Sequence, residues 1–145
     1  DRWWEKERGP MVLTPHPGEM ATLTGLAAAD IQQDRVGVAR EYAVRWGVCL
    51  VLKGANTIIS QPDGAVRLAA LANPGMSTGG TGDVLSGVIA GLMAQGLEPA
   101  VAASCGVYLH GAAGRSIVSE LGNTGTAASD LLPQIPLAMR RLRDI

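Results

Sequence analysis

The chain has 145 residues, a formal net charge of −1 and no long run of either charge, which argues against a nucleic-acid-binding surface. With 47% apolar residues it can form a domain with a core, and no stretch approaches the roughly 20 apolar residues that would span a bilayer. Its 19 glycines and lack of phenylalanine favour helices packed closely on a sheet, so we expect an α/β fold rather than an all-β one.

The first third of the chain alternates short apolar segments with helical patterns. In order, we predict a loop over 1–10, a strand over 11–14, helices over 17–26 and 34–46, and a strand over 48–52. Asp34 is a suitable cap for the second helix and Gly47 a suitable end. The strand at 48–52 is continuously apolar, which is typical of a strand buried on both faces in a parallel sheet.

The rest of the chain begins with a hairpin pattern and continues with helices. We predict strands over 57–60 and 65–70 around a Pro-Asp-Gly turn, a glycine-rich loop over 73–82, and helices over 84–95 and 99–120. A last helix from about Asp130 should be broken around Pro133 and Pro136. Together the elements predict one α/β unit over 1–145, with a mainly parallel sheet, an antiparallel edge hairpin and helices on both faces.

The strongest candidate site is the glycine-rich loop that opens the helix at 84–95. The start of a helix leaves backbone N–H groups unpaired and carries partial positive charge, and Gly79, Gly80 and Gly82 would let that backbone approach a phosphate. Asp83 would then lie at the mouth of the pocket, where it could take a proton from a hydroxyl that is being phosphorylated. The structural alternative is that Asp83 only caps the helix. The loop is not a Walker A motif, because no Lys-Ser or Lys-Thr follows Gly82.

Two further candidate segments follow predicted strands. The segment Lys53-Gly54-Ala55-Asn56-Thr57 comes directly after the buried strand, where ligands bind in doubly wound sheets. Its lysine could meet a phosphate, or could simply be a solvated side chain in a turn. His16 lies between two prolines that stiffen the backbone, so its ring could be aimed at a ligand, although a structural role is equally consistent with the pattern.

Three other reactive side chains receive a structural interpretation. Cys49 and Cys105 lie in separate apolar segments, without the close spacing of a disulfide framework or a zinc site, so we interpret them as reduced thiols in a cytosolic protein. His110 lies in a hydrophobic helix and is interpreted as a packed, hydrogen-bonded core histidine.

Four blocks of sequence, in this order and at this spacing, resemble one enzyme family. They are Leu-Thr-Pro-His-Pro-Gly-Glu-Met (13–20), Val-Leu-Lys-Gly-Ala-Asn-Thr (51–57), Asn-Pro-Gly-Met-Ser-Thr-Gly-Gly-Thr-Gly-Asp-Val-Leu-Ser-Gly (73–87) and Leu-His-Gly-Ala-Ala-Gly (109–114). This set is similar to the ADP- or ATP-dependent NAD(P)H-hydrate dehydratases. The resemblance covers nearly all of the chain after Pro10.

The resemblance implies a ribokinase-like three-layer fold and a lyase that repairs the S-epimer of hydrated NADH or NADPH. The nucleotide would phosphorylate the added hydroxyl, and phosphate would then leave. By match of motif, Lys53 to Thr57 and Gly82 would bind the adenine nucleotide, while His16 and Asp83 would contact the hydrated cofactor, with Asp83 as the base. The resemblance also implies Mg²⁺, a cytoplasmic location and a homo-oligomer.

The chain departs from the family pattern in three places. It is about half as long as the family's domain, so we expect 1–145 to be the C-terminal half. Thr81 stands where many relatives have methionine, and Arg115 where relatives usually have an acid. Two alternatives follow: a ribokinase-like small-molecule kinase with the same phosphate pocket, and a non-catalytic nucleotide-binding fragment that needs its N-terminal half.

Overall fold

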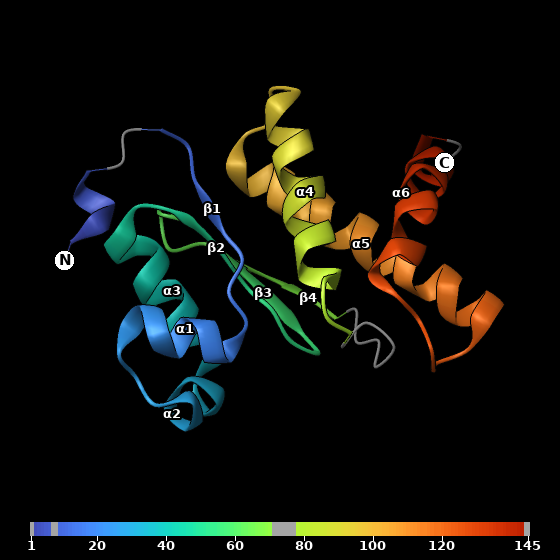
Figure 1. The fold of residues 1–145 in the computed structure, drawn as a ribbon. Coiled ribbons are helices and arrows are strands. Elements are labelled where there is room, and N and C mark those ends of the chain that lie inside the picture. Colours follow the sequence, from blue (N-terminus) through green and yellow to red (C-terminus); the bar gives the residue numbers. More distant parts are fainter. Residues whose placement is uncertain (1, 7–8, 71–77, 144–145) are drawn as a thin grey trace.

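The computed structural model describes residues 2–6, 9–70 and 78–143. The elements are η1 (Trp3–Glu5), β1 (Val12–Leu13), α1 (Pro17–Thr24), α2 (Ala28–Gln33), α3 (Arg35–Trp46), β2 (Cys49–Leu52), β3 (Thr57–Ser60), β4 (Val66–Ala69), α4 (Thr81–Ala94), α5 (Pro99–Leu121) and α6 (Ala128–Arg143). The sheet order is β1-β2-β3-β4. Helices α1 to α3 lie on one face of this sheet and α4 to α6 on the other (Figure 1).

Strand β2 is the centre of the molecule because both of its faces are covered. All four of its residues are buried. Leu50 and Leu52 pack with the helices α1 to α3, whereas Cys49 and Val51 pack with α4 and α5. This two-sided burial explains the unbroken apolar run in the sequence, since a strand with one solvent face would alternate instead.

The sheet is mixed in the part of the chain that the structure describes, and in this respect it differs from the mainly parallel sheet that we expected. The pair β1–β2 is parallel, whereas β2–β3 and β3–β4 are antiparallel. The reason lies in the connections. Only the link from β1 to β2 contains helices that can carry the chain back for a parallel pairing, while the other two links are tight turns. The α/β class, the helices on both faces and the hairpin β3–β4 are confirmed.

The predicted limits of the first helices agree with the structure. Asp34 caps α3, because its Oδ1 accepts a hydrogen bond from the Gly37 N–H at 2.8 Å, and Gly47 ends the helix in the left-handed conformation with φ 67°. Helix α1 ends at Gly25 in the same way. Helix α2 is an element that sequence reasoning missed; the residue before it makes no side-chain capping bond.

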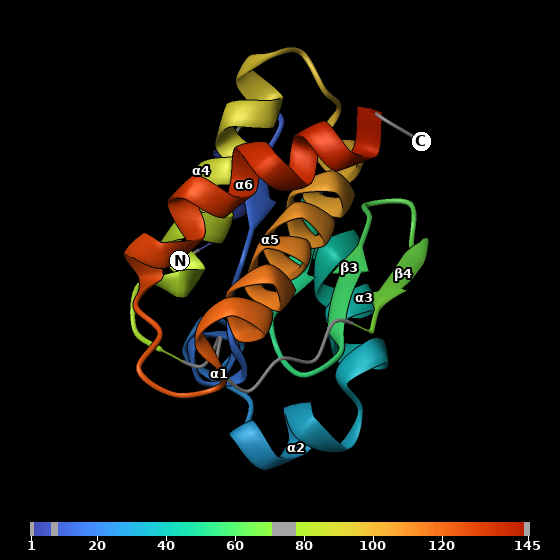
Figure 2. The ribbon, with the colours of Figure 1, turned by 90° about the vertical axis from the view of Figure 1, so that its right-hand side faces the viewer.

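Helix α6 continues through both of its prolines, so the predicted break is wrong. Pro133 and Pro136 are exposed and lie on the outer side of the helix, where the carbonyl groups that lose a partner can be solvated. The opposite side is apolar: Leu131 and Ile135 pack against α5, and Ala138 joins the main core on this face. Figure 2 shows α6 lying across α5. The tertiary contact therefore outweighs the local loss of two donors.

Helix α5 is apolar because it packs between the sheet and the other two helices of its face. Within the described ranges, no helix is both long enough and apolar enough to cross a membrane. Both cysteines are free thiols; Cys49 is buried and Cys105 half-buried. Burial raises the pKa of the Cys49 thiol to about 11, although nearby Arg67 opposes the shift, so Cys49 stays protonated.

The contact between α4 and α5 depends on a glycine. A Cβ added at Gly106 would come within 2.5 Å of Ile89 Cγ1. We therefore expect Gly106→Val to lower the free energy of unfolding by about 1–3 kcal/mol through overpacking. As a control, Gly91→Ala places a methyl group in open space on the exposed side of α4 and should stabilise by about 0.5–1 kcal/mol. Urea unfolding measures the free energy of unfolding of both variants. Equal stability of the two would contradict the close contact between Gly106 and Ile89.

Candidate functional site

The glycine-rich loop leads directly into α4, as predicted, but the helix begins three residues earlier than expected. Its N-cap is Gly80, in the left-handed conformation with φ 88°, and no side chain caps this end. Asp83 therefore lies in the first turn of the helix and is exposed, so it does not act as the N-cap. The Thr81 hydroxyl donates to the Thr78 carbonyl at 2.8 Å and closes the turn. The part of the predicted loop over 73–77 lies outside the described residues.

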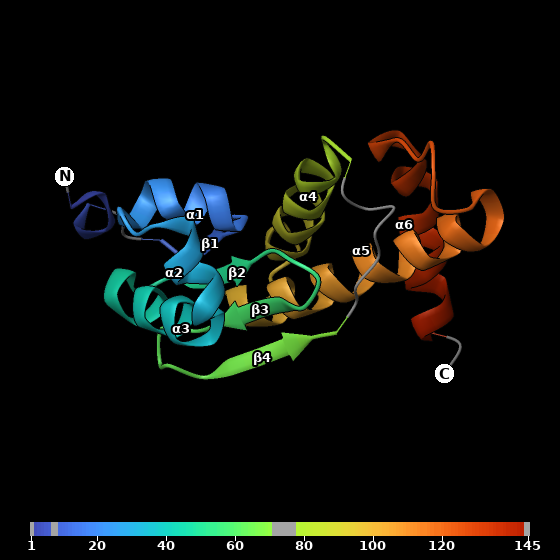
Figure 3. The ribbon, with the colours of Figure 1, turned by 90° about the horizontal axis from the view of Figure 1, so that it is seen from below.

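A pocket of about 480 Å³ lies over this end of α4, at the end of the sheet where β1 and β2 finish. Its lining residues are His16, Glu19, Lys53, Gly54, Thr78, Gly79, Gly80, Thr81, Gly82 and Asp83. An adjoining hollow of about 120 Å³ shares Lys53, Thr81 and Gly82 with it and is also lined by Thr57 and His110. Figure 3 shows β2, β3 and β4 side by side, with α4 on the right of α1. Of the predicted residues, only Ala55 and Asn56 line neither pocket.

Lys53 is held in place from three directions. Its backbone N–H donates to the Pro15 carbonyl at 2.8 Å, which continues the pairing of the parallel strands. Its ammonium nitrogen lies 3.3 Å from Glu19 Oε2. On the other side, a Cβ at Gly82 would be only 2.9 Å from Lys53 Nζ, so the ammonium lies directly against the backbone of the first turn of α4. The side chain is only 23% exposed, and its charge therefore stays at the helix start.

His16 has a structural role in addition to its place in the pocket. It caps α1: Nδ1 accepts hydrogen bonds from the N–H groups of Gly18 and Glu19 at 3.0 and 3.1 Å. Because Nδ1 is an acceptor, a neutral ring carries its hydrogen on Nε2. The side chain is 55% exposed, with Nε2 3.6 Å from Glu19 Oε1. The capping contacts, together with the flanking prolines, fix the direction of the ring.

Glu19 is a pocket residue that sequence reasoning did not select. Its Oε2 accepts a hydrogen bond from the His16 backbone N–H at 2.6 Å, which completes a capping box. Partial burial raises the pKa of its carboxyl, but the His16 bond and the Lys53 ammonium outweigh burial and bring the pKa below its usual value of 4.5. The signal was present in the sequence as a capping residue followed three positions later by Glu, with histidine replacing the usual serine or threonine.

Helix α4 is also tied to the segment after β1 and to α5 near the pocket. The Ser86 hydroxyl donates to the Gly82 carbonyl at 3.0 Å and lies 2.9 Å from the Thr14 hydroxyl. His110 Nε2 donates to the Thr81 carbonyl at 2.8 Å. Burial lowers the pKa of His110, and nearby Lys53 adds to this against the opposing effect of the Thr81 bond. The interpretation of His110 as a hydrogen-bonded, packed histidine is confirmed, although the ring also borders the smaller hollow.

The arrangement can bind an anion and accept a proton. Backbone N–H groups at a helix start and a lysine ammonium are the usual ligands of phosphate, and the Asp83 carboxylate lines the same pocket. Among the described residues, no three His, Cys, Asp or Glu side chains are grouped so that they could hold a metal ion.

Comparison with known proteins gives one consistent result. A family model described as NAD(P)H-hydrate dehydratase matches residues 2–137. The chain is 53% identical over 138 residues to the bifunctional NAD(P)H-hydrate repair enzyme Nnr of Moorella thermoacetica, covering 95% of this chain and 26% of that protein. It is 37% identical over 133 residues to the ADP-dependent (S)-NAD(P)H-hydrate dehydratase of Xanthomonas campestris, covering 92% of this chain and 46% of that protein.

A solved structure agrees with these relatives. The ADP/ATP-dependent NAD(P)H-hydrate dehydratase from Bacillus subtilis, co-crystallized with ATP/Mg²⁺, matches with a TM-score of 0.88 and 36% sequence identity. The match covers 93% of this chain and 49% of that chain. The chain thus spans about half the length of the solved relative, and a smaller share of the bifunctional proteins.

The lowered pKa of Glu19 predicts a pH-dependent contribution to stability. Because the carboxylate is favoured in the folded state, its contribution is present above the usual pKa of 4.5 and is lost as the pH falls through the lower folded-state value. Glu19→Gln should therefore lower the denaturant midpoint at pH 7, and this difference should shrink towards pH 3. Glu41→Gln, an exposed change on α3, is the matched control. A Glu19→Gln difference that stays constant from pH 7 to pH 3 would disprove the charge-based role.

Proposed function

Since the chain belongs to the NAD(P)H-hydrate dehydratase family, we propose that it is a lyase that uses ADP or ATP to dehydrate the S-epimer of hydrated NADH or NADPH. The product is the normal reduced cofactor. This proposal rests on one observation: Lys53, His16 and Asp83 all line the same pocket at the start of α4.

The nucleotide would bind by its phosphates at the start of α4. The backbone at Gly79, Gly80 and Gly82 lets the phosphates approach the N–H groups, while the Lys53 ammonium supplies a full positive charge beside them. The segment Lys53–Thr57 would bind the rest of the adenine nucleotide, with Thr57 bordering the smaller hollow next to the main pocket.

Asp83 would act as the base in the phosphoryl transfer. Its carboxylate takes the proton of the substrate's added hydroxyl, whose oxygen bonds to the terminal phosphorus while the bond to the remaining nucleotide breaks. The C–O bond of the resulting phosphate ester then breaks, phosphate leaves, and loss of a ring proton restores the double bond. Negative charge on the transferring group is stabilised by Lys53 and the helix start. His16 would contact the hydrated cofactor through its exposed ring edge.

The residues fit a magnesium ion that arrives with the nucleotide. Mg²⁺ is commonly bound by one or two carboxylates together with phosphate oxygens, and Glu19 and Asp83 both line the pocket. The ion would neutralise phosphate charge.

A cytoplasmic location and a homo-oligomeric state are further inferences from the family. Light scattering during size-exclusion chromatography measures the oligomeric state directly.

The activity is tested by mixing the purified chain with hydrated NADH, ADP or ATP, and Mg²⁺. We expect absorbance of the reduced nicotinamide to return and free phosphate to appear in equal amounts. The match to the Moorella thermoacetica relative covers 95% of this chain but only 26% of that protein. The assay is therefore run with the chain alone and with the preceding half-domain of that relative added or fused. A stable phosphorylated product would instead indicate a kinase. Nucleotide binding without turnover in either form would indicate a non-catalytic fragment.

Asp83→Asn isolates the role of the base. We expect turnover to fall by about 100-fold or more, the usual contribution of a general base, because the variant removes the proton acceptor. The affinity for nucleotide should stay within a few-fold, since the N–H groups and Lys53 are unchanged. Steady-state kinetics and calorimetric titration with ADP measure the two quantities. Retained turnover would overturn the role of Asp83.

A further inference from the structure

We infer that Arg35 is a positioning residue for the nucleotide-binding turn, which we define as Lys53–Thr57. The inference rests on the proposed function of that turn. Arg35 does not line the pocket or the adjoining hollow. It holds the backbone from which Lys53 projects, and so acts on the nucleotide through Lys53.

The place of Arg35 in the fold is unfavourable unless it has a specific partner. It is the first residue of α3, directly after the capping Asp34. A positive charge at the amino end of a helix is opposed by the helix dipole. The guanidinium group leaves the helix and reaches the turn between β2 and β3, where carbonyl oxygens provide the compensating contacts.

A single nitrogen of Arg35 bonds three carbonyl groups of this turn. Its Nη2 donates to the oxygens of Leu52 at 3.3 Å, Lys53 at 3.2 Å and Asn56 at 3.0 Å. These carbonyls lie on both sides of the turn, so the cation joins its beginning to its end. A planar guanidinium can share its N–H groups among these three oxygens. The N–H groups of a lysine ammonium point in other directions, so a lysine at this position would not make the same set of bonds. Within the turn, the Thr57 hydroxyl donates to the Gly54 carbonyl at 3.3 Å.

The contact with Arg35 also explains Gly54. A Cβ at position 54 would overlap the Arg35 guanidinium, with Nη1 as its nearest atom. The side of Gly54 that a Cβ would occupy faces Arg35, so the absence of a side chain serves the packing of the guanidinium.

The result for Lys53 is a backbone held from both sides. Its carbonyl accepts from Arg35 Nη2 at 3.2 Å, and its N–H donates to the Pro15 carbonyl at 2.8 Å. With the backbone fixed, the side chain reaches Glu19 and the start of α4 in one direction. Loss of Arg35 would free the turn and widen the range of positions open to the ammonium.

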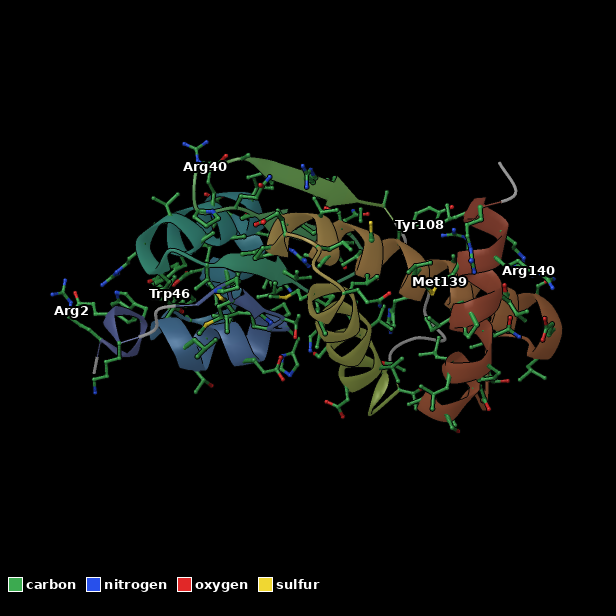
Figure 4. All side chains as sticks on the ribbon, turned by 90° about the horizontal axis from the view of Figure 1, so that it is seen from above. Arg2, Arg40, Trp46, Tyr108, Met139 and Arg140 are labelled. Atoms are coloured by element: carbon green, nitrogen blue, oxygen red, sulfur yellow. The ribbon has the colours of Figure 1, made fainter. Side chains whose placement is uncertain are left out.

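The first test is Arg35→Ala, measured on the form of the protein that binds nucleotide. We expect the Kd and KM for ADP or ATP to rise by about ten- to a hundredfold, because the ammonium that binds the phosphates is misplaced. The kcat at saturating nucleotide should stay within about threefold. Arg35→Lys should recover part of this loss. The matched control is Arg40→Ala on the same helix, whose side chain points away from the protein in Figure 4 and should leave both constants unchanged.

The second test is a double-mutant cycle between Arg35 and Gly54. Gly54→Ala alone should weaken nucleotide binding, because its methyl group displaces the guanidinium. In the Arg35→Ala background the same change should have little further effect, since the space is open. If the double variant raises the nucleotide Kd by the product of the two single-variant factors, the two residues act independently and the inference is overturned.

The outcomes separate this inference from the proposed function. If the unchanged protein binds no adenine nucleotide, the proposed function fails. If it binds nucleotide, and Arg35→Ala lowers the unfolding midpoint without changing the nucleotide Kd, Arg35 is merely structural and only the inference fails. Far-UV circular dichroism establishes that each variant is folded; should Arg35→Ala be unfolded, Arg35→Lys and Gly54→Ala must show the rise in Kd.

Discussion

The site depends on two positive groups held side by side. The Lys53 ammonium lies against Gly82, in the first turn of α4, where the helix dipole also places positive charge. Such a pair repels, and the carboxylates of Glu19, 3.3 Å from the ammonium, and Asp83, in the same pocket, offset this repulsion. The ammonium and the backbone N–H groups are donors that suit an anion with several oxygens. A nucleotide polyphosphate meets this requirement, which is the physical basis of the proposed function.

The fold brings these groups together through the two-sided burial of β2. Because alternate residues of β2 pack against helices on opposite faces, a slip of one residue would move every side chain into the core on the other face, where it would meet different neighbours. The strand therefore delivers Lys53 to a defined place at its end. Parallel pairing with β1 brings His16 and Glu19 to the same end of the sheet, and α4 approaches from one face. Three segments that are distant in sequence thus line one pocket.

The residues that shape this pocket differ in how they could be recognised. Lys53, Asp83 and the glycines follow from local patterns, because a glycine-rich loop before a helix and a lysine after a buried strand have a direct chemical meaning. Glu19 follows only once the capping box is recognised, since His16 replaces the usual hydroxyl residue. Arg35 could not be found in this way. Its partners Leu52, Lys53 and Asn56 are 17 to 21 positions away, and they are backbone atoms that leave no mark on the sequence.

The sequence by itself determined the α/β class, the limits of helices α1, α3 and α5, and the edge hairpin, and it predicted a phosphate-binding loop before α4. These depend on local periodicity, on caps such as Asp34 and Gly47, and on turn residues. The tertiary structure alone decided the mixed pairing of the sheet and the continuity of α6, because packing against α5 outweighs two prolines whose effect is local. It also decided which side of Gly54 is filled and where the Lys53 ammonium lies, since both depend on atoms brought together only by folding.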